Sequence, residues 1–75
     1  MVIRVGDTLR TNTAGRDEIK YVERVIKASF ENMYKVHDTD DESVVSHIYD
    51  KDIKDVMVNG NWVAYSPQKK KPFII

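Results

Sequence analysis

Apolar and polar residues alternate along two neighbouring stretches in the middle of this chain. Residues 33–37 read Met-Tyr-Lys-Val-His, and residues 44–49 form a second run rich in β-branched and aromatic side chains. A period of two residues is typical of a strand that buries one face. Residues 38–43, which are polar and mostly acidic, separate the two runs. The pattern therefore predicts a hairpin, and we name its connection, residues 38–43, the acidic loop.

The segment 17–28 is ambiguous by periodicity alone. Its apolar residues Ile19, Val22, Val25 and Ile26 recur at helical spacing, which favours a helix. Against a helix, most of these residues are β-branched, and no Ser, Thr or Asn stands directly before Asp17 to cap one. Because a turn-like stretch and a clear strand follow, we predict one long strand here. A helix over about 17–30, in an α+β fold, is the alternative.

Turn signals divide the remaining chain. Residues 1–11 mix β-branched residues with a central Gly-Asp, which predicts a strand interrupted by a turn or bulge. Residues 11–15 are rich in Asn, Thr and Gly and predict a loop. Farther on, Asp50 is placed to cap a single 3₁₀ turn, and Ile53 can point back into the core.

The strongest local signal is the Asn-Gly pair at residues 59–60, between two alternating apolar runs. Asn-Gly is the preferred pair for a two-residue type I′ hairpin turn. In the register set by that turn, one face carries Val56, Val58, Val63 and Tyr65, and the other carries Met57, Trp62 and Ala64. Either the Trp62 face closes the core and the valines point outward, or Trp62 and Met57 form an exposed contact surface.

Together these elements predict an all-β fold, a small barrel of five or six short antiparallel strands with one 3₁₀ turn. The Val-Gly-Asp-Thr-Leu opening at residues 5–9, the Tyr34-Lys35-Val36 strand and the Asp52-Ile53 turn before the last hairpin resemble SH3-like barrels of the Tudor and KOW type. The resemblance covers roughly residues 2–65 and implies a binding module. A Tudor-type cage for a methylated ligand would require several aromatic residues to converge, and the available ones are Tyr21, Tyr34, Tyr49, Trp62 and Tyr65.

Length and composition limit the size of the hydrophobic core and bear on where in the cell we expect the protein. The chain has 75 residues and no cysteine, and a chain of this size buries only roughly 60% of its unfolded surface. We expect residues 1–66 to form one domain, followed by a basic and then apolar tail at residues 67–75. No apolar run approaches the roughly 18–20 residues that span a bilayer, and the N-terminus lacks a signal-peptide core, so we expect a cytoplasmic protein that does not contact membranes.

No group of residues has the spacing of a catalytic, cofactor or metal site. His37 and His47 lie on the two strands of the first predicted hairpin, but if Val44 is opposite His37, then His47 lies nearer Tyr34. Ser46 and His47 are adjacent in a strand and so point to opposite faces. The acidic loop lacks the glycine and the glutamate of a calcium-binding loop. We expect a protein that is not an enzyme and binds no cofactor.

The charge distribution points to a binding surface. The formal net charge is zero, but acidic residues dominate residues 36–55 while the two flanking parts are basic. We expect protein–protein binding through Asp38, Asp40, Asp41, Glu42, Met57 and Trp62. Small strand-rich chains without cysteine resemble accessory proteins of bacteria or their phages, which bind and modulate a larger assembly.

The alternative partner is a nucleic acid, bound by a barrel that uses a basic strand and a lysine tail. Its contact residues would be Arg10, Arg16, Arg24, Lys27, Lys35, Lys69, Lys70 and Lys71. The sequence pI of about 6.7 is far below the value typical of such domains. The sequence leaves the oligomeric state open.

Overall fold

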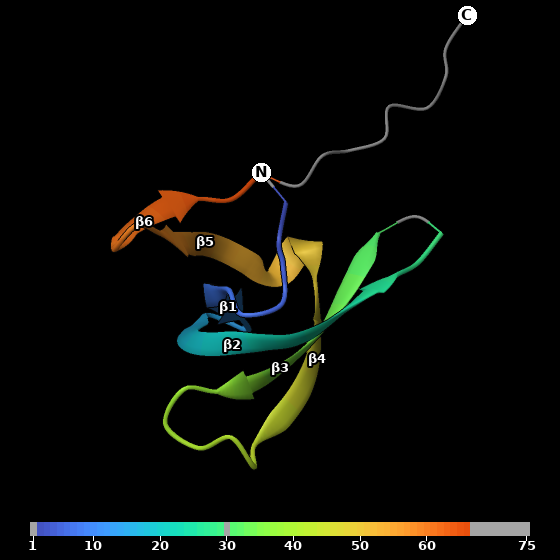
Figure 1. The fold of residues 1–75 in the computed structure, drawn as a ribbon, viewed down its shortest axis with the longest axis horizontal. Helices are drawn as coiled ribbons and strands as arrows, with labels where there is room; N and C mark the ends of the chain where they lie inside the picture. The colour runs from blue at the N-terminus through green and yellow to red at the C-terminus, as the bar shows by residue number, and fades with distance from the viewer. Residues whose placement is uncertain (1, 30, 67–75) are drawn as a thin grey trace, which may run out of the picture.

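The computed structural model describes residues 2–29 and 31–66, which form one antiparallel sheet and one 3₁₀ turn (Figure 1). The elements are β1 (Thr8–Thr13), β2 (Arg16–Lys27), β3 (Asn32–Asp38), β4 (Val45–Tyr49), η1 (Asp50–Asp52), β5 (Ile53–Val58) and β6 (Asn61–Ala64). Their order across the six-stranded sheet is β4-β3-β2-β1-β5-β6. The all-β prediction is therefore confirmed.

The ambiguous segment is a strand, β2, of 12 residues. Part of the helical spacing of its apolar side chains, Val22 to Val25, coincides with a β-bulge in the strand. Val22 lies opposite Val36, whereas Arg24 lies opposite Lys35, so one extra residue shifts the alternation. Val22 is buried in the core and Val25 packs against it, three residues farther on. The alternative helix is wrong, because residues 16–27 form a strand that pairs with β1 on one side and β3 on the other.

A two-residue turn joins β1 to β2. Ala14 and Gly15 both have positive φ, 52° and 79°, as a type I′ turn requires. β1 runs to Thr13, so the loop predicted over residues 11–15 is shorter than expected. Thr11 belongs to the strand, is only 2% exposed, and its hydroxyl donates a hydrogen bond to the next strand.

The predicted strand at the start of the chain begins only at Thr8. Before it, the backbone turns: Arg4 N donates to the Asp7 carboxylate at 2.8 Å, and Asp7 N donates to Arg4 O at 3.1 Å. Gly6 has a φ of 95°, which favours glycine. The predicted interruption is therefore a full turn, and the segment before it contributes Ile3, 3% exposed, to the core.

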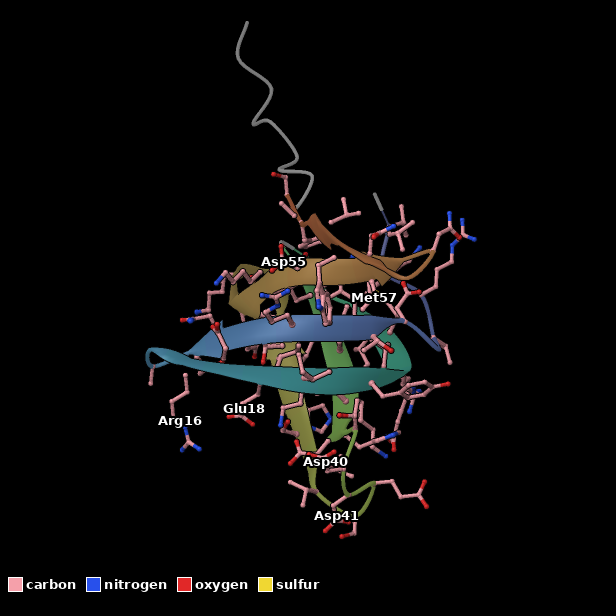
Figure 2. All side chains as sticks on the ribbon, turned by 90° about the vertical axis from the view of Figure 1, so that its left-hand side faces the viewer. Arg16, Glu18, Asp40, Asp41, Asp55 and Met57 are labelled. Carbon is pink, nitrogen blue, oxygen red and sulfur yellow. The ribbon has the colours of Figure 1, made fainter. Side chains whose placement is uncertain are left out.

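The sheet bends over itself, and its inner face encloses the core. In Figure 2, β3 and β4 cross behind β1, β5 and part of β2. Every strand except β6 contributes to the buried cluster, together with the N-terminal segment: Ile3, Leu9, Val22, Tyr34, Val36, Ile48, Ile53 and Val56. Tyr65, directly after β6, packs against this cluster.

The bent sheet is open. β4 and β6 are its two edge strands, and no strand pairing joins them within residues 2–29 and 31–66. The strand number and the 3₁₀ turn agree with the predicted barrel, but no backbone pairing within the described residues closes the sheet. Side chains link the two ends instead: the Tyr34 and Tyr65 hydroxyls donate to Asp50 Oδ1 at 2.6 and 2.7 Å.

η1 forms where the sequence predicts it, but its capping differs. Asp52 Oδ2 accepts a hydrogen bond from Tyr49 N at 2.9 Å, at the start of the turn. Asp50, the predicted cap, is engaged with the two tyrosine hydroxyls. Ile53 points into the core as predicted and is 6% exposed.

The β5–β6 hairpin has the predicted register, with Met57 opposite Trp62. Asn59 and Gly60 have φ of 49° and 81°, the conformation that the Asn-Gly signal predicts. Val56 is 2% exposed and belongs to the core. The valine face is therefore the inner one, and the interpretation in which the Trp62 face closes the core is wrong.

The β3–β4 hairpin is also present, with a register shifted by one residue from the predicted one. Val45, instead of Val44, lies opposite His37, and His47 lies opposite Lys35. The predicted C-terminal tail, residues 67–75, lies outside the described residues.

Candidate functional site

Arg10 is held between two side chains on the outer face of the sheet, the face opposite the core. Its neighbours Leu9 and Thr11 are buried, so Arg10 points outward. Its guanidinium carbon is 4.6 Å from the centre of the Trp62 ring, and its Nε is 3.4 Å from Asp55 Oδ2. The guanidinium thus lies over the indole and forms an ion pair with the carboxylate, while its buried Nε has no hydrogen-bond partner among the described residues.

Apolar side chains surround this arginine. Ile19, its cross-strand partner, and Tyr21 are each 38% exposed. Met57 and Trp62 lie opposite each other and are half-buried. We name these five residues, Arg10, Ile19, Tyr21, Met57 and Trp62, the outer patch. They come from four adjacent strands, β2, β1, β5 and β6, and Figure 2 looks onto this face, with Met57 and Asp55 labelled.

A polar cluster fixes Tyr21 at the margin of the patch. The His37 ring stacks on Tyr21, with 4.9 Å between ring centres and 27° between ring planes. His37 Nδ1 is 2.7 Å from Glu23 Oε1, and Lys35 Nζ is 3.6 Å from Glu23 Oε2. The hydrogen bond with His37 and the nearby Lys35 ammonium lower the pKa of Glu23 below its usual value. His37 thus orients Tyr21, while His47 lies on the next strand opposite Lys35.

The acidic loop has a shape held by its own side chains. Asp41 Oδ1 accepts hydrogen bonds from Ser43 Oγ at 2.6 Å and from Ser43 N at 3.0 Å. These bonds lower the pKa of Asp41. Asp40, Asp41 and Glu42 are all exposed. The loop therefore presents several carboxylates from a defined backbone.

Lys20 is a buried cation at the base of the acidic loop. Its side chain is 9% exposed and forms ion pairs with Glu18, at 2.9 Å, and with Asp38. Burial lowers the pKa of Lys20, but the hydrogen bonds to Asp38 and Glu18 outweigh burial, so the pKa lies above its usual value. A hollow of about 360 Å³ lies beside it, lined by Asp17, Glu18, Ile19, Asp38, Thr39 and Asp40.

The protein-contact residues predicted from the sequence lie in two separate places. Met57 and Trp62 belong to the outer patch, whereas Asp38, Asp40, Asp41 and Glu42 lie at the connection between β3 and β4. Strands β2 and β1 separate β3 from β5 in the sheet. Figure 2 shows Asp40 and Asp41 at one end of the molecule, away from Met57. The fold therefore offers two candidate surfaces.

The basic residues predicted for nucleic-acid contact that lie within residues 2–29 and 31–66 do not form one surface. Arg16 and Lys27 are the first and last of the 12 residues of β2, and an extended chain of that length spans about 36 Å. Arg10 and Lys35 lie 3.4 and 3.6 Å from carboxylates, and Arg24 is exposed at the bulge. Lys69, Lys70 and Lys71 lie outside the described residues.

The aromatic residues that the structure describes do not converge into a cage. Tyr34 and Tyr65 meet inside the molecule at Asp50, and burial, followed by their hydrogen bonds to Asp50, raises the pKa of both hydroxyls. Trp62 is on the outer face of β6. Tyr49, at the end of β4, has Lys51 Nζ 5.7 Å from its ring centre. The described aromatic side chains thus lie in three separate parts of the structure.

Ile19, Tyr21 and the contact of Arg10 with Trp62 were not predicted as parts of a binding surface. Alternation along β2 could have indicated the outward direction of Ile19 and Tyr21. The proximity of Arg10 to Trp62 depends on β1 pairing with β5, a contact between distant parts of the chain that local patterns do not reveal.

Among the described residues, no group of three His, Asp or Glu side chains is placed to hold a metal ion, and no helix could cross a membrane. No protein-family model, curated protein or solved structure matches this chain.

Proposed function

We propose that this chain is a non-enzymatic binding module, a small accessory protein that contacts a larger protein assembly through the outer patch. The observation that carries the proposal is the arrangement of Arg10 between Trp62 and Asp55 on an outward-facing, partly apolar surface. The resemblance of the sequence to SH3-like barrels supports the same class of function.

The residue types of the outer patch are those that contribute most to protein interfaces. Trp, Tyr, Met and Arg are enriched at such interfaces, and Trp, Tyr and Arg dominate their binding energy. Because Asp55 and Trp62 already hold the Arg10 guanidinium, binding would cost less side-chain entropy there. Exposed Ile19 and Tyr21 would supply apolar area beside it.

Nucleic-acid binding is the less supported alternative. A phosphate-binding surface needs basic side chains that are free to replace counterions along one track. Here Arg10, Lys20 and Lys35 already contact carboxylates, and Lys54 lies 3.5 Å from Asp17. The described basic residues therefore offer few free charges on one face.

A matched pair of variants tests the proposal. Ile19 and Val58 are 38% and 37% exposed, but only Ile19 belongs to the outer patch. Ile19→Asp should abolish retention of a protein from nuclease-treated lysate, whereas Val58→Asp should leave retention as in the unaltered chain. Quantitative mass spectrometry of the retained proteins, with melting curves for both variants, gives the comparison.

Two results would count against the proposal. One is equal retention by both folded variants. The other is binding of a labelled single-stranded oligonucleotide whose affinity falls log-linearly with salt, by about 10³ between 50 and 200 mM, as phosphate contacts require.

A further inference from the structure

β4 has a strand neighbour on one side only within the described residues, because it lies at the edge of the sheet next to β3. Asp38 N donates a hydrogen bond to Val44 O at 3.1 Å. Asp38 and Val44 are therefore a hydrogen-bonded pair of the antiparallel ladder, in which the backbone groups of each residue point toward the other strand. In the unbroken β3–β4 register, facing pairs then alternate, so Ser46 and Ile48 bond to β3. The N–H and C=O groups of Val45 and His47 consequently point away from the sheet.

The far end of this edge is already satisfied. Tyr49 N also points away from β3, and it donates to Asp52 Oδ2 at 2.9 Å. Strand addition is therefore possible over Val45 and His47 and stops at η1. Natural sheets usually protect such edges with charged residues or proline, yet β4, with the sequence VSHIY, contains neither.

Exposed apolar side chains accompany the open backbone groups. Val44 and Val45 lie at the start of the edge strand β4, and they are 45% and 44% exposed. At the same end of β4, the acidic loop presents Asp40, Asp41 and Glu42. The bonds between Asp41 and Ser43 hold that loop in place. Among the described residues, an edge strand without charged residues or proline thus lies directly beside a loop of exposed carboxylates.

We propose that the edge of β4 binds an extended segment of a partner protein, added antiparallel to β4, with apolar side chains beside Val45 and basic side chains at its C-terminal end beside the acidic loop. The inference rests on the proposed protein-binding function and names the kind of partner. Backbone pairing supplies the affinity in this mode of recognition, and the side chains supply the specificity.

Charge complementarity favours this occupant over a second copy of the chain. An antiparallel pair of β4 strands would place the acidic loop of one copy near η1 of the other, where Asp50 and Asp52 stand against Lys51. Like charges at such a contact oppose association. A segment ending in Lys or Arg instead meets opposite charge.

Amide hydrogen exchange tests the geometry of the edge. In the free protein, Ser46 and Ile48 amides should exchange slowly and Val45 and His47 amides quickly. Slow exchange at Val45 and His47 that grows with protein concentration would show that a second copy occupies the edge, and would overturn the proposal.

A peptide library tests the occupant. Random twelve-residue peptides displayed on phage are selected on the immobilised chain. We expect selected peptides with alternating apolar residues and Lys or Arg toward the C-terminal end, which on binding slow the exchange of the Val45 and His47 amides.

Two variants of one residue provide the matched control. His47→Pro removes the outward N–H without removing a bond to β3, and proline is tolerated at that kind of position. His47→Thr changes the side chain and keeps the N–H. Peptide affinity should fall at least about tenfold in His47→Pro, because the backbone N–H that would bond to the peptide is removed. It should change by less than about threefold in His47→Thr, because that N–H is kept.

If His47→Pro fails to fold, N-methylation of Val45 in a chemically synthesised chain removes another outward N–H and should give the same loss. An empty selection, or selected peptides that bind His47→Pro as well as the unaltered chain, would overturn the proposal. Peptides that bind through the outer patch, and lose affinity only with Ile19→Asp, would leave the proposed function standing while removing this inference.

Discussion

Replacing Tyr65 with phenylalanine should measure how strongly side chains hold the two ends of the open sheet together. Tyr65 follows edge strand β6, and its hydroxyl donates to Asp50 Oδ1 at 2.7 Å. Tyr34 donates to the same oxygen at 2.6 Å, and Asn32 N donates to Oδ2 at 3.3 Å. Asp50 therefore connects β3, η1 and the segment after β6.

The expected loss follows from the charge of the acceptor. A hydrogen bond to a charged group contributes about 1.5–3 kcal/mol to stability. Because Asp50 keeps Tyr34 as a donor in Tyr65→Phe, we expect the lower end, about 1.5 kcal/mol. For a domain of this size, that lowers the Tm by roughly 6–12 °C.

Thermal unfolding followed by circular dichroism at pH 7 measures this shift. Tyr49→Phe is the matched control, since Tyr49 is 38% exposed and is not one of the two tyrosines whose hydroxyls donate to Asp50. Its Tm should change by less than about 4 °C. Equal Tm values for the two variants would refute the reasoning, because Asp50 would then not connect the ends of the sheet.

The same cluster predicts a loss of stability at high pH. The pKa of Tyr34 and Tyr65 is raised above the model-peptide value of 10.0 in the folded chain. A raised pKa means that folding favours the protonated hydroxyl, so the stabilisation is complete below pH 10 and is lost as pH rises above it. The Tm of Tyr65→Phe should therefore fall less steeply between pH 10 and 12 than the Tm of the unaltered chain.

Three further predictions test other parts of the fold by the same melting experiment. Gly60→Val should cost about 1–3 kcal/mol, because a β-branched residue would have to adopt a φ of 81°; an unchanged Tm would contradict the type I′ turn. Lys20→Met should lower the free energy of unfolding by about 1–3 kcal/mol, because two carboxylates are left together without their cation. The control Lys54→Met, at a side chain that is 51% exposed, should lower it by less than about 1 kcal/mol. Equal losses in the two variants would argue against the buried cation. The pKa of Glu23 is lowered by its hydrogen bond with His37, so the stability it contributes is present above pH 4.5 and lost as pH falls below that value; Glu23→Gln should flatten the acid limb of a plot of Tm against pH, and an unaltered limb would contradict the pairing.

The bulge in β2 explains why periodicity was least informative in that segment. An extra residue in a strand places two core residues three positions apart, which is also the spacing of one helical face. The missing N-cap before Asp17 and the turn and strand that follow in sequence decided the prediction correctly, and the structure shows that this segment pairs with β1 and β3. The bulge itself leaves no local signal in the residue types.

The candidate surfaces were predicted unevenly for a related reason. The exposed acidic loop followed from composition and its position between two strands. The outer patch did not, since it requires β1, β2, β5 and β6 to lie side by side, and β1 and β5 are about forty residues apart. Arg10 was assigned to a nucleic-acid surface because its partners, Trp62 and Asp55, reach it only through that pairing.

The sequence by itself determined that the fold is all-β, that a 3₁₀ turn forms at residues 50–52 and that Asn59-Gly60 closes a hairpin, because alternation and turn chemistry act over a few neighbouring residues. Only the tertiary structure decided which face of the last hairpin is inside, how Asp50 joins Tyr34 to Tyr65, and that β4, within residues 2–29 and 31–66, has a strand neighbour on one side only. Those features depend on how the sheet bends and on which distant strands become neighbours, and both are set by the packing of the whole core at once.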